Sequence, residues 1–302
     1  MRKLRGPLPA LIALAASLAC RGPVPVLGPA ADGLVVMTFN IRLNTAGDGP
    51  NAWPLRRDMA ASTILFHEAA IVGLQEALRD QITDLEARLP GYGWVGVGRD
   101  DGKDGGEFNA LFYDRARLRL LEGATFWLSA TPDVPGSRGW DAACNRVVSW
   151  ARFEDRATGR VFHAFNTHFD HMGATARRES ALLLLRRIDE IAGSGPAVVT
   201  GDFNCTSEDE PYRILISGLA AGAGLRDART ASALPPYGGT RSFNGFRAQT
   251  GPGSIIDHIF VRGPAVVARV GVIADKWDGR FVSDHEPVLA EIVVGPAAAE
   301  GR

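Results

Sequence analysis

Apolar, strand-like runs in this chain end repeatedly on a residue with a polar or ionisable side chain. The instances are the runs 35–39 before Asn40, 71–74 before Gln75 and Glu76, 161–167 before His168, 197–201 before Asp202 to Asn204, and later Ile255-Ile256-Asp257 and Phe281 to His285. Ionisable groups at the ends of buried strands are costly unless each is hydrogen-bonded, paired or bound to a metal. Strands that share this feature predict an active site at the edge of a sheet core.

The alternation of strand-like runs with amphipathic segments predicts an α/β fold. Helices are expected at 57–68, 80–89 and 175–192, the last with Ala181, Leu184, Leu185, Ile188 and Ile191 on one face. Strands are expected at 34–41, 70–76, 107–113, 118–127, 146–154, 161–168, 197–202, 255–262, 266–273 and 287–294. So many strands with few helices favour two sheets packed face to face, with helices outside, over a parallel βαβ array.

The N-terminal segment has the layout of an export signal. A basic start is followed by an apolar, Ala-rich stretch at 8–19, too short for a membrane span. Cys20 resembles the lipidated cysteine of a bacterial lipoprotein, and signal cleavage near residues 30–31 or a hydrophobic tail are the alternatives. We expect a signal at 1–20, a Pro/Gly/Ala-rich tether at 21–32, one domain at 33–295, a flexible tail at 296–302, and a periplasmic, outer-membrane-anchored or secreted protein.

Charge and cysteine content exclude some classes of function. The chain carries 33 basic and 34 acidic residues, so it has no polycationic character with which to hold nucleic acid nonspecifically. Cys144 and Cys205 lack the spacing of a zinc site, and we interpret both as small buried residues in preference to a disulfide pair.

The carboxylates and amides at the ends of the runs are hard oxygen donors. Mg²⁺, or alternatively Mn²⁺, prefers such ligands, whereas zinc prefers nitrogen and sulfur. Any one of these residues alone is better explained as a turn residue that bonds its own backbone. Six such positions in one chain favour a metal-dependent site.

Two histidines are candidates for proton transfer. His168 lies in the segment Phe165-Asn166-Thr167-His168, and His285 follows Asp284 directly. Imidazole titrates near neutrality and is effective when a carboxylate fixes its tautomer. Asp257 is the candidate partner for His285, while His67, His163 and His258 have no sequence context beyond a structural one.

Taken together, these motifs resemble the endonuclease/exonuclease/phosphatase superfamily, in a bacterial exported branch. That superfamily includes deoxyribonuclease I, abasic-site endonucleases, neutral sphingomyelinases and inositol-phosphate phosphatases. The motifs that carry the resemblance, in family order, are Thr-Phe-Asn-Ile-Arg at 38–42, Gly-Leu-Gln-Glu at 73–76, Asn166 with His168, Gly-Asp-Phe-Asn at 201–204, Ile-Asp-His-Ile at 256–259 and Ser-Asp-His at 283–285. Each motif is weak alone, and the ordered set spans the whole expected domain.

The resemblance implies a four-layer α/β sandwich with two mixed, mostly antiparallel sheets flanked by helices, and it implies a role for each motif. Asn40, Glu76 and Asp284 would surround the metal. Asp202 and Asn204 would handle the attacking water and a phosphoryl oxygen. The remaining catalytic candidates are Asp257, which would hold His285 as base or charge stabiliser, His168, which would contact the phosphate or protonate the leaving oxygen, and Glu107, which would orient His168.

Four further residues are candidates for substrate binding, namely Asn166, Arg146, His171 and Arg178. For each arginine a surface or structural ion pair is an equal alternative. The Asp- and Gly-rich segment 99–107 lacks the final glutamate of a calcium loop, and we expect a mobile loop that borders the cleft.

The predicted activity is divalent-metal-dependent phosphoester hydrolysis by in-line attack of water, most simply by a phosphodiesterase of nuclease type. The alternatives are a phosphomonoesterase, a phospholipid or inositol-phosphate phosphoesterase, or a catalytically silent module that binds a phosphorylated ligand. The expected partner is a phosphoester substrate, which would be nucleic acid, a phospholipid head group or a small phosphate. A lipid anchor at Cys20 and a monomeric state are also expected, with no protein partner.

Overall fold

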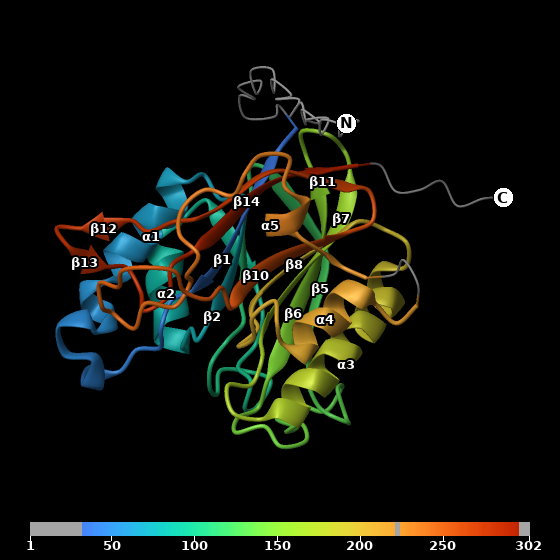
Figure 1. Cartoon of the computed structure of the whole chain (residues 1–302), viewed down its shortest axis with the longest axis horizontal. Coiled ribbons are helices and arrows are strands. Elements are labelled where there is room, and N and C mark those ends of the chain that lie inside the picture. The colour runs from blue at the N-terminus through green and yellow to red at the C-terminus, as the bar shows by residue number, and fades with distance from the viewer. Residues whose placement is uncertain (1–31, 221–223, 296–302) are drawn as a thin grey trace, which may run out of the picture.

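Two six-stranded sheets form the centre of the molecule (Figure 1). The computed structural model describes residues 32–220 and 224–295. The first sheet has the order β11 (Ala265–Val272), β14 (Val288–Val294), β1 (Leu34–Asn40), β2 (Ile71–Gln75), β4 (Leu111–Asp114), β3 (Tyr92–Val95). The second has the order β5 (Leu118–Trp127), β6 (Val147–Asp155), β7 (Val161–His168), β8 (Ala197–Asp202), β10 (Asp257–Arg262), β9 (Arg226–Asp227).

Each sheet is mixed and mostly antiparallel. In the first sheet β1 and β2 are parallel, and in the second β7 and β8 are parallel, while the other neighbouring strands pair antiparallel. The minor strands β12 (Lys276–Trp277) and β13 (Arg280–Phe281) form a separate hairpin. The predicted α/β sandwich of two such sheets is therefore confirmed.

Helices cover the outer faces of both sheets and complete the four layers. In Figure 1, α1 (Arg57–Phe66) and α2 (Arg79–Arg88) lie on one side of the molecule, and α3 (Ala174–Ala192) and α4 (Glu210–Ser217) lie on the other. The chain also forms the short helix α5 (Ala228–Ala231) and the 3₁₀ segments η1 (Ala46–Asn51) and η2 (Trp53–Leu55). Among the described residues, no helix has the length and apolar character needed to cross a bilayer.

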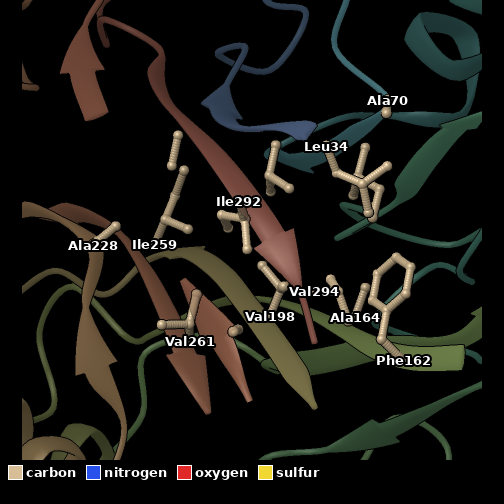
Figure 2. Packing of buried hydrophobic residues seen from close by; sticks show 14 of the residues in the cluster. Leu34, Ala70, Phe162, Ala164, Val198, Ala228, Ile259, Val261, Ile292 and Val294 are labelled. Atoms are coloured by element: carbon tan, nitrogen blue, oxygen red, sulfur yellow. The ribbon is translucent and has the colours of Figure 1, made fainter. Parts of the chain in front are cut away.

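Alternating side chains on the strands build three apolar clusters. On β1, Leu34 and Val36 join the cluster between the two sheets, whereas Met37 and Phe39 join the cluster under α1 and α2. This alternation follows from the two-residue period of a strand. Figure 2 shows the cluster between the sheets. The first sheet contributes side chains such as Ile292 on β14, and the second contributes side chains such as Val198 on β8.

The helix α3 buries the face that the sequence predicts. Ala181, Leu184 and Ile188 are fully buried in the cluster beneath α3 and α4. The first turn of α3 has no capping side chain of its own; instead Asp141 accepts hydrogen bonds from the backbone N–H groups of Thr175 and Ala176. The segment 139–146 is thereby tied to the start of this helix.

The late strands depart from the sequence expectation in a way that matters for the site. Strand β10 begins at Asp257, so Ile255 and Ile256 precede the strand instead of forming its start. Residues 281–285 form no long apolar strand, because β13 ends at Phe281 and β14 begins at Val288. The expected strand 107–113 is shortened to β4, and β3, β9, β12, β13 and α4 were not expected.

Several sequence expectations concern residues outside the described part of the chain. They are the export signal at 1–20 with Cys20, nearly all of the tether at 21–32, and the tail at 296–302. Within the described part, Cys144 and Cys205 are unpaired, and Cys144 is half-buried whereas the sequence interpretation placed it fully inside.

Candidate active site

Polar side chains from both sheets meet at one common edge of the sandwich. Asn40 at the end of β1 is in register with Gln75 at the end of β2. His168 at the end of β7 is in register with Asp202 at the end of β8, which in turn faces Asp257. Of these residues, His168 and Asp202 line a cavity of about 440 Å³. Its full lining is Arg42, Leu43, Glu76, Arg99, Glu107, Cys144, Arg146, His168, His171, Asp202, Asn204, Phe243, Ile256, Asp284 and His285.

Asn40 joins the two sheets at this edge. Its Nδ2 donates to Glu76 Oε1 and to Asp202 Oδ2, both at 3.0 Å, and lies 3.4 Å from His285 Nε2. Its Oδ1 accepts the backbone N–H of Arg42 at 3.0 Å. The amide oxygen is therefore turned toward the backbone of Arg42 and the amide nitrogen toward Glu76 and Asp202, and the role of Asn40 as an oxygen ligand for a metal stays a prediction.

His285 lies between two buried carboxylates. Its Nδ1 is 2.9 Å from Asp257 Oδ2, and its Nε2 is 3.7 Å from Asp202 Oδ2. Burial by itself would lower the pKa of His285, but Asp257 and Asp202 outweigh burial and raise it. Burial and the charge of Asp257 likewise raise the pKa of Asp202. The geometry thus favours a cationic imidazole at His285 beside a carboxylate, Asp202, that takes up a proton more readily than an ordinary aspartate.

His168 has a different environment. Its Nε2 lies 3.0 Å from Asn204 Nδ2 and 3.5 Å from Asp202 Oδ2, and its buried Nδ1 has no partner among the described residues. Burial, and next the charge of Arg146, hold the pKa of His168 well below its usual value. His168 is therefore a neutral ring, and its link to Asn204 requires Nε2 to be the acceptor.

Glu76 and Asp284 form a carboxylate pair in the same cavity. Arg42 lies between them, with guanidinium nitrogens 3.7 Å from Glu76 and 3.9 Å from Asp284. Burial, with Glu76 adding to it, raises the pKa of Asp284, whose side chain accepts a hydrogen bond from Ser283 Oγ. A half-buried and a buried carboxylate that line the same cavity fit a divalent cation, and hard oxygen ligands suit Mg²⁺.

A second group of donors is close enough to be considered for a metal. Asp202, Asp257 and His285 present ligand atoms within 4.8 Å of one another. Both ring nitrogens of His285, however, face carboxylate oxygens, an arrangement that a protonated imidazole satisfies without any metal. We therefore favour Glu76 and Asp284 as the metal-binding residues.

Three residues at the cavity hold unusual backbone conformations. Arg42, Glu76 and Asn204 have φ values of 56°, 62° and 46°, in the left-handed region that non-glycine residues seldom adopt. Glu76 in addition accepts the backbone N–H of Leu43 at 3.2 Å. Such strain persists only where surrounding contacts enforce it, and it is commonly found at functional sites.

Glu107 does not make the contact that the sequence suggested. Its Oε2 is bonded to Arg99 at 2.6 Å, and it forms no hydrogen bond to His168 in the structure. Burial raises the pKa of Glu107 although Arg99 opposes this. Glu107 lines the cavity, but it positions Arg99 instead of His168.

The four suggested substrate-binding residues separate into two pairs. Arg146 and His171 line the cavity. Asn166 is fully buried between the sheets, where it donates to the carbonyl groups of Leu74 and Ala110. Arg178 lies on α3 outside the cavity and pairs with Glu179 and Glu210.

Sequence reasoning did not single out Arg42, Arg99 or Phe243. Arg42 belongs to the motif at 38–42 and Arg99 to the segment 99–107, so both stood in regions already noted. Arg99 and Glu107 of that segment do line the cavity, and the segment closes on itself through backbone bonds such as Arg99 N–H to Glu107 C=O at 3.1 Å. Phe243 places its ring edge-on to the His285 ring, with 5.0 Å between centroids, and no local sequence pattern marks it.

The double-sheet sandwich with polar groups gathered at one edge has the fold of the deoxyribonuclease I-like class of proteins. The chain belongs to the Endonuclease/Exonuclease/phosphatase family, whose family model matches residues 37–285. It is 42% identical to the endonuclease/exonuclease/phosphatase of Bacteroides vulgatus, with a TM-score of 0.83, over 87% of this chain and 99% of that one. It is 37% identical to a mannosyl-6-phosphatase of Bacteroides thetaiotaomicron, with a TM-score of 0.79, over 86% of this chain and 99% of that one.

A more distant relative comes from a virus. An uncharacterized protein of Acanthamoeba polyphaga mimivirus is 31% identical over 160 residues, which are 50% of this chain. The match covers 59% of the viral protein, less than two thirds of its length.

Proposed function

We propose that this protein is a divalent-metal-dependent phosphoester hydrolase that uses water as the nucleophile. The observation that carries the proposal is that one cavity combines the Asp257–His285–Asp202 chain with the Glu76 and Asp284 carboxylate pair. A purely structural cluster would neither need to border a cavity nor require strained backbone at Glu76. Family membership supports the same reaction class.

Glu76 and Asp284 would hold the cation, with Mg²⁺ as the proposed ion and Mn²⁺ as the alternative. When bound there, a divalent cation offsets the negative charge that develops on the phosphoryl oxygens. Asn40 would keep Glu76 and Asp202 at a fixed separation, because one amide nitrogen donates to both.

Asp202 is the proposed acceptor of the proton from the attacking water. Its raised pKa suits a base that works near neutrality, and the backbone N–H of Asn204 holds its Oδ1 at 3.0 Å. His285, held as a cation by Asp257, would donate from Nε2 to an oxygen of the phosphoryl group. His168 would contact the substrate as a neutral ring, because its depressed pKa makes it a poor acid.

The nuclease-type activity expected from the sequence stays a prediction, and the structure gives reason to consider a phosphomonoester beside it. The relative at 37% identity is a mannosyl-6-phosphatase. The cavity lining pairs three arginines and the His285 cation against four carboxylates, which are Glu76, Glu107, Asp202 and Asp284. The net charge of this lining is therefore close to zero. A bound divalent cation would make the cavity positive, which suits a monoester phosphate with two negative charges.

Hydrolysis of p-nitrophenyl phosphate and bis-p-nitrophenyl phosphate with Mg²⁺, with and without EDTA, tests the proposal. We expect EDTA-sensitive turnover that falls by about 10²- to 10⁴-fold in His285→Ala. His67→Ala is the control, because His67 pairs with Asp275 near the surface and should leave turnover unchanged. Absence of turnover on both compounds and on a panel of sugar phosphates, nucleic acids and phospholipids would favour a silent binding module.

A further inference from the structure

Arg146 is a buried cation with one donor group left free. It directly precedes β6, is 4% exposed and lines the cavity beside His168. Its Nε is 3.3 Å from Asp170 Oδ2, and its Nη2 is 3.0 Å from His171 Nδ1. Its Nη1 is buried and has no hydrogen-bond partner within the described part of the chain.

Asp170 fixes the orientation of this guanidinium. Its Oδ1 accepts the backbone N–H groups of Met172 at 3.0 Å and Gly173 at 2.7 Å, and its Oδ2 also accepts that of Cys144 at 3.3 Å. Burial alone would raise the pKa of Asp170, but these backbone donors and Arg146 lower it. Asp170 therefore stays ionised and holds the Nε edge of the guanidinium in place.

His171 fixes the second edge. Because Nη2 of Arg146 can only donate, His171 Nδ1 must be the acceptor in this contact. With two edges held, Nη1 is the part of the guanidinium still available to bind another group.

A buried, charged N–H group without an acceptor is costly, and the cost is recovered when an anion binds. Arg99 repeats the pattern in the same cavity, since its Nη1 is bonded to Glu107 while its buried Nε has no hydrogen-bond partner in the described structure and lies 4.0 Å from Asp100. Other arginines with an unpartnered buried nitrogen, such as Arg57 and Arg187, lie outside this cavity. Because Arg146 and Arg99 both line the candidate active site, their unpartnered donors point to an anionic ligand there.

We propose that Arg146 binds a non-bridging oxygen of a phosphomonoester through Nη1, and that Asp170 is the positioning residue for this contact. The inference rests on the proposed phosphoester hydrolase activity and narrows its substrate. Arg146 Nη1 and Arg99 Nε provide two donors in the cavity that have no hydrogen-bond partner among the described residues, and the cation proposed at Glu76 and Asp284 would be a third contact. A monoester phosphate offers three non-bridging oxygens, whereas a diester offers two and places a second ester substituent where the third would lie.

Arg146→Lys tests the contact, since lysine keeps the charge but loses the planar donor arrangement. We expect the KM for p-nitrophenyl phosphate and the Kd for inorganic phosphate, measured by calorimetry on metal-free protein, to rise about tenfold or more. The KM for bis-p-nitrophenyl phosphate should change less. Asp170→Asn should raise the monoester KM in the same direction with a smaller effect on kcat.

Arg117→Lys is the matched control. Arg117 forms an ion pair with the buried Asp155 at the far end of β6, so it has the same chemistry without access to the cavity. Its phosphate affinity and KM should equal those of the unmodified protein at temperatures well below the melting transition of each variant.

The outcomes separate the two proposals. Turnover of the unmodified protein on neither compound, and on none of the sugar phosphates, nucleic acids and phospholipids of the panel, would reject the hydrolase itself. Turnover with unchanged monoester KM and phosphate Kd in Arg146→Lys, or equal losses on both esters, would reject only the monoester contact. A crystal structure of the unmodified protein with inorganic phosphate needs no variant: a phosphate oxygen within hydrogen-bond distance of Nη1 supports the inference, and phosphate bound elsewhere overturns it.

Discussion

Asp257, the first residue of β10, lies directly opposite Asp202, the last residue of β8. The two strands run antiparallel, so the start of one and the end of the other meet at the same edge of the sheet. His285 then spans the two carboxylates with one ring nitrogen toward each. Strand pairing therefore sets the separation of the charged groups before any side-chain contact is made.

Asp257→Asn should reduce turnover strongly and shift its pH dependence. The amide keeps the shape of Asp257 but removes the charge that raises the pKa of His285. Because His285 must be cationic, activity is lost as pH rises through its pKa, so the alkaline limb of kcat/KM should move to lower pH in the variant. We expect a loss of about 10²-fold or more at neutral pH, and an unshifted alkaline limb would argue against a cationic role for His285.

Glu76→Gln should weaken Mg²⁺ binding more than it lowers the stability of the fold. The amide removes one of two carboxylate charges at the proposed cation site, so the Mg²⁺ concentration for half-maximal activity should rise by about tenfold or more. Chelation with EDTA should abolish activity in both proteins, and excess Mg²⁺ should restore it. Asp48→Asn is a useful comparison, because Asp48 pairs with Arg42 at 3.1 Å without lining the cavity; an equal effect there would assign the loss to Arg42.

The sequence predicted the layers better than the site's internal contacts. Strands such as β1 and β8 were predictable because long apolar runs bury side chains on both faces. The short strand β3, Tyr-Gly-Trp-Val, lacks that signal and depends on its pairing with β4. A residue at the end of a strand lies at the edge of the sheet, and the strand ends could be recognised in the sequence. The prediction therefore placed Asn40, His168 and Asp202 together at one edge, as the strand pairing shows.

The direction in which a side chain points is a tertiary property, and sequence motifs do not carry it. Glu107 was expected to orient His168, but Arg99 lies closer and takes its hydrogen bond. The hydrogen bonds of Asn40 could not be read from its motif either: its oxygen accepts the backbone N–H of Arg42, and its nitrogen donates to Glu76 and Asp202. Asn166 stood in a site motif because it lies on the same strand as His168, two residues earlier. Its side chain, however, points into the space between the sheets.

Gly73→Ala should destabilise the protein near the site. A Cβ on Gly73 in β2 would overlap Thr200 of β8 and Asn166 of β7, because the two sheets approach closely at this point. Overpacking of this kind costs about 1–3 kcal/mol in the free energy of unfolding. Gly91→Ala is the control, since no atom lies within 4 Å of a Cβ there; urea unfolding that shows equal stability for both variants would contradict the close sheet contact.

Asp227 and His258 form a buried pair whose contribution to stability should depend on pH. Asp227 Oδ2 lies 2.8 Å from the Tyr212 hydroxyl group and 3.2 Å from His258 Nδ1, and Oδ1 accepts the backbone N–H of Arg229 at 2.7 Å. Burial by itself would raise the pKa of Asp227, but His258 and these donors lower it below its ordinary value. The folded state therefore binds this proton less readily than the unfolded chain does.

It follows that the ionised Asp227 stabilises the fold above its unfolded pKa of about 4 and loses this effect as pH falls through the lower folded pKa. Asp227→Asn should lower the free energy of unfolding at pH 7 by about 1–3 kcal/mol. The difference from the unmodified protein should narrow below about pH 4, measured by urea unfolding from pH 7 to pH 3. Asp275→Asn breaks the more exposed pair with His67 and should cost less than about 0.5 kcal/mol; a difference for Asp227→Asn that stays constant across the whole pH range would show that the charge of Asp227 is not what stabilises this pair.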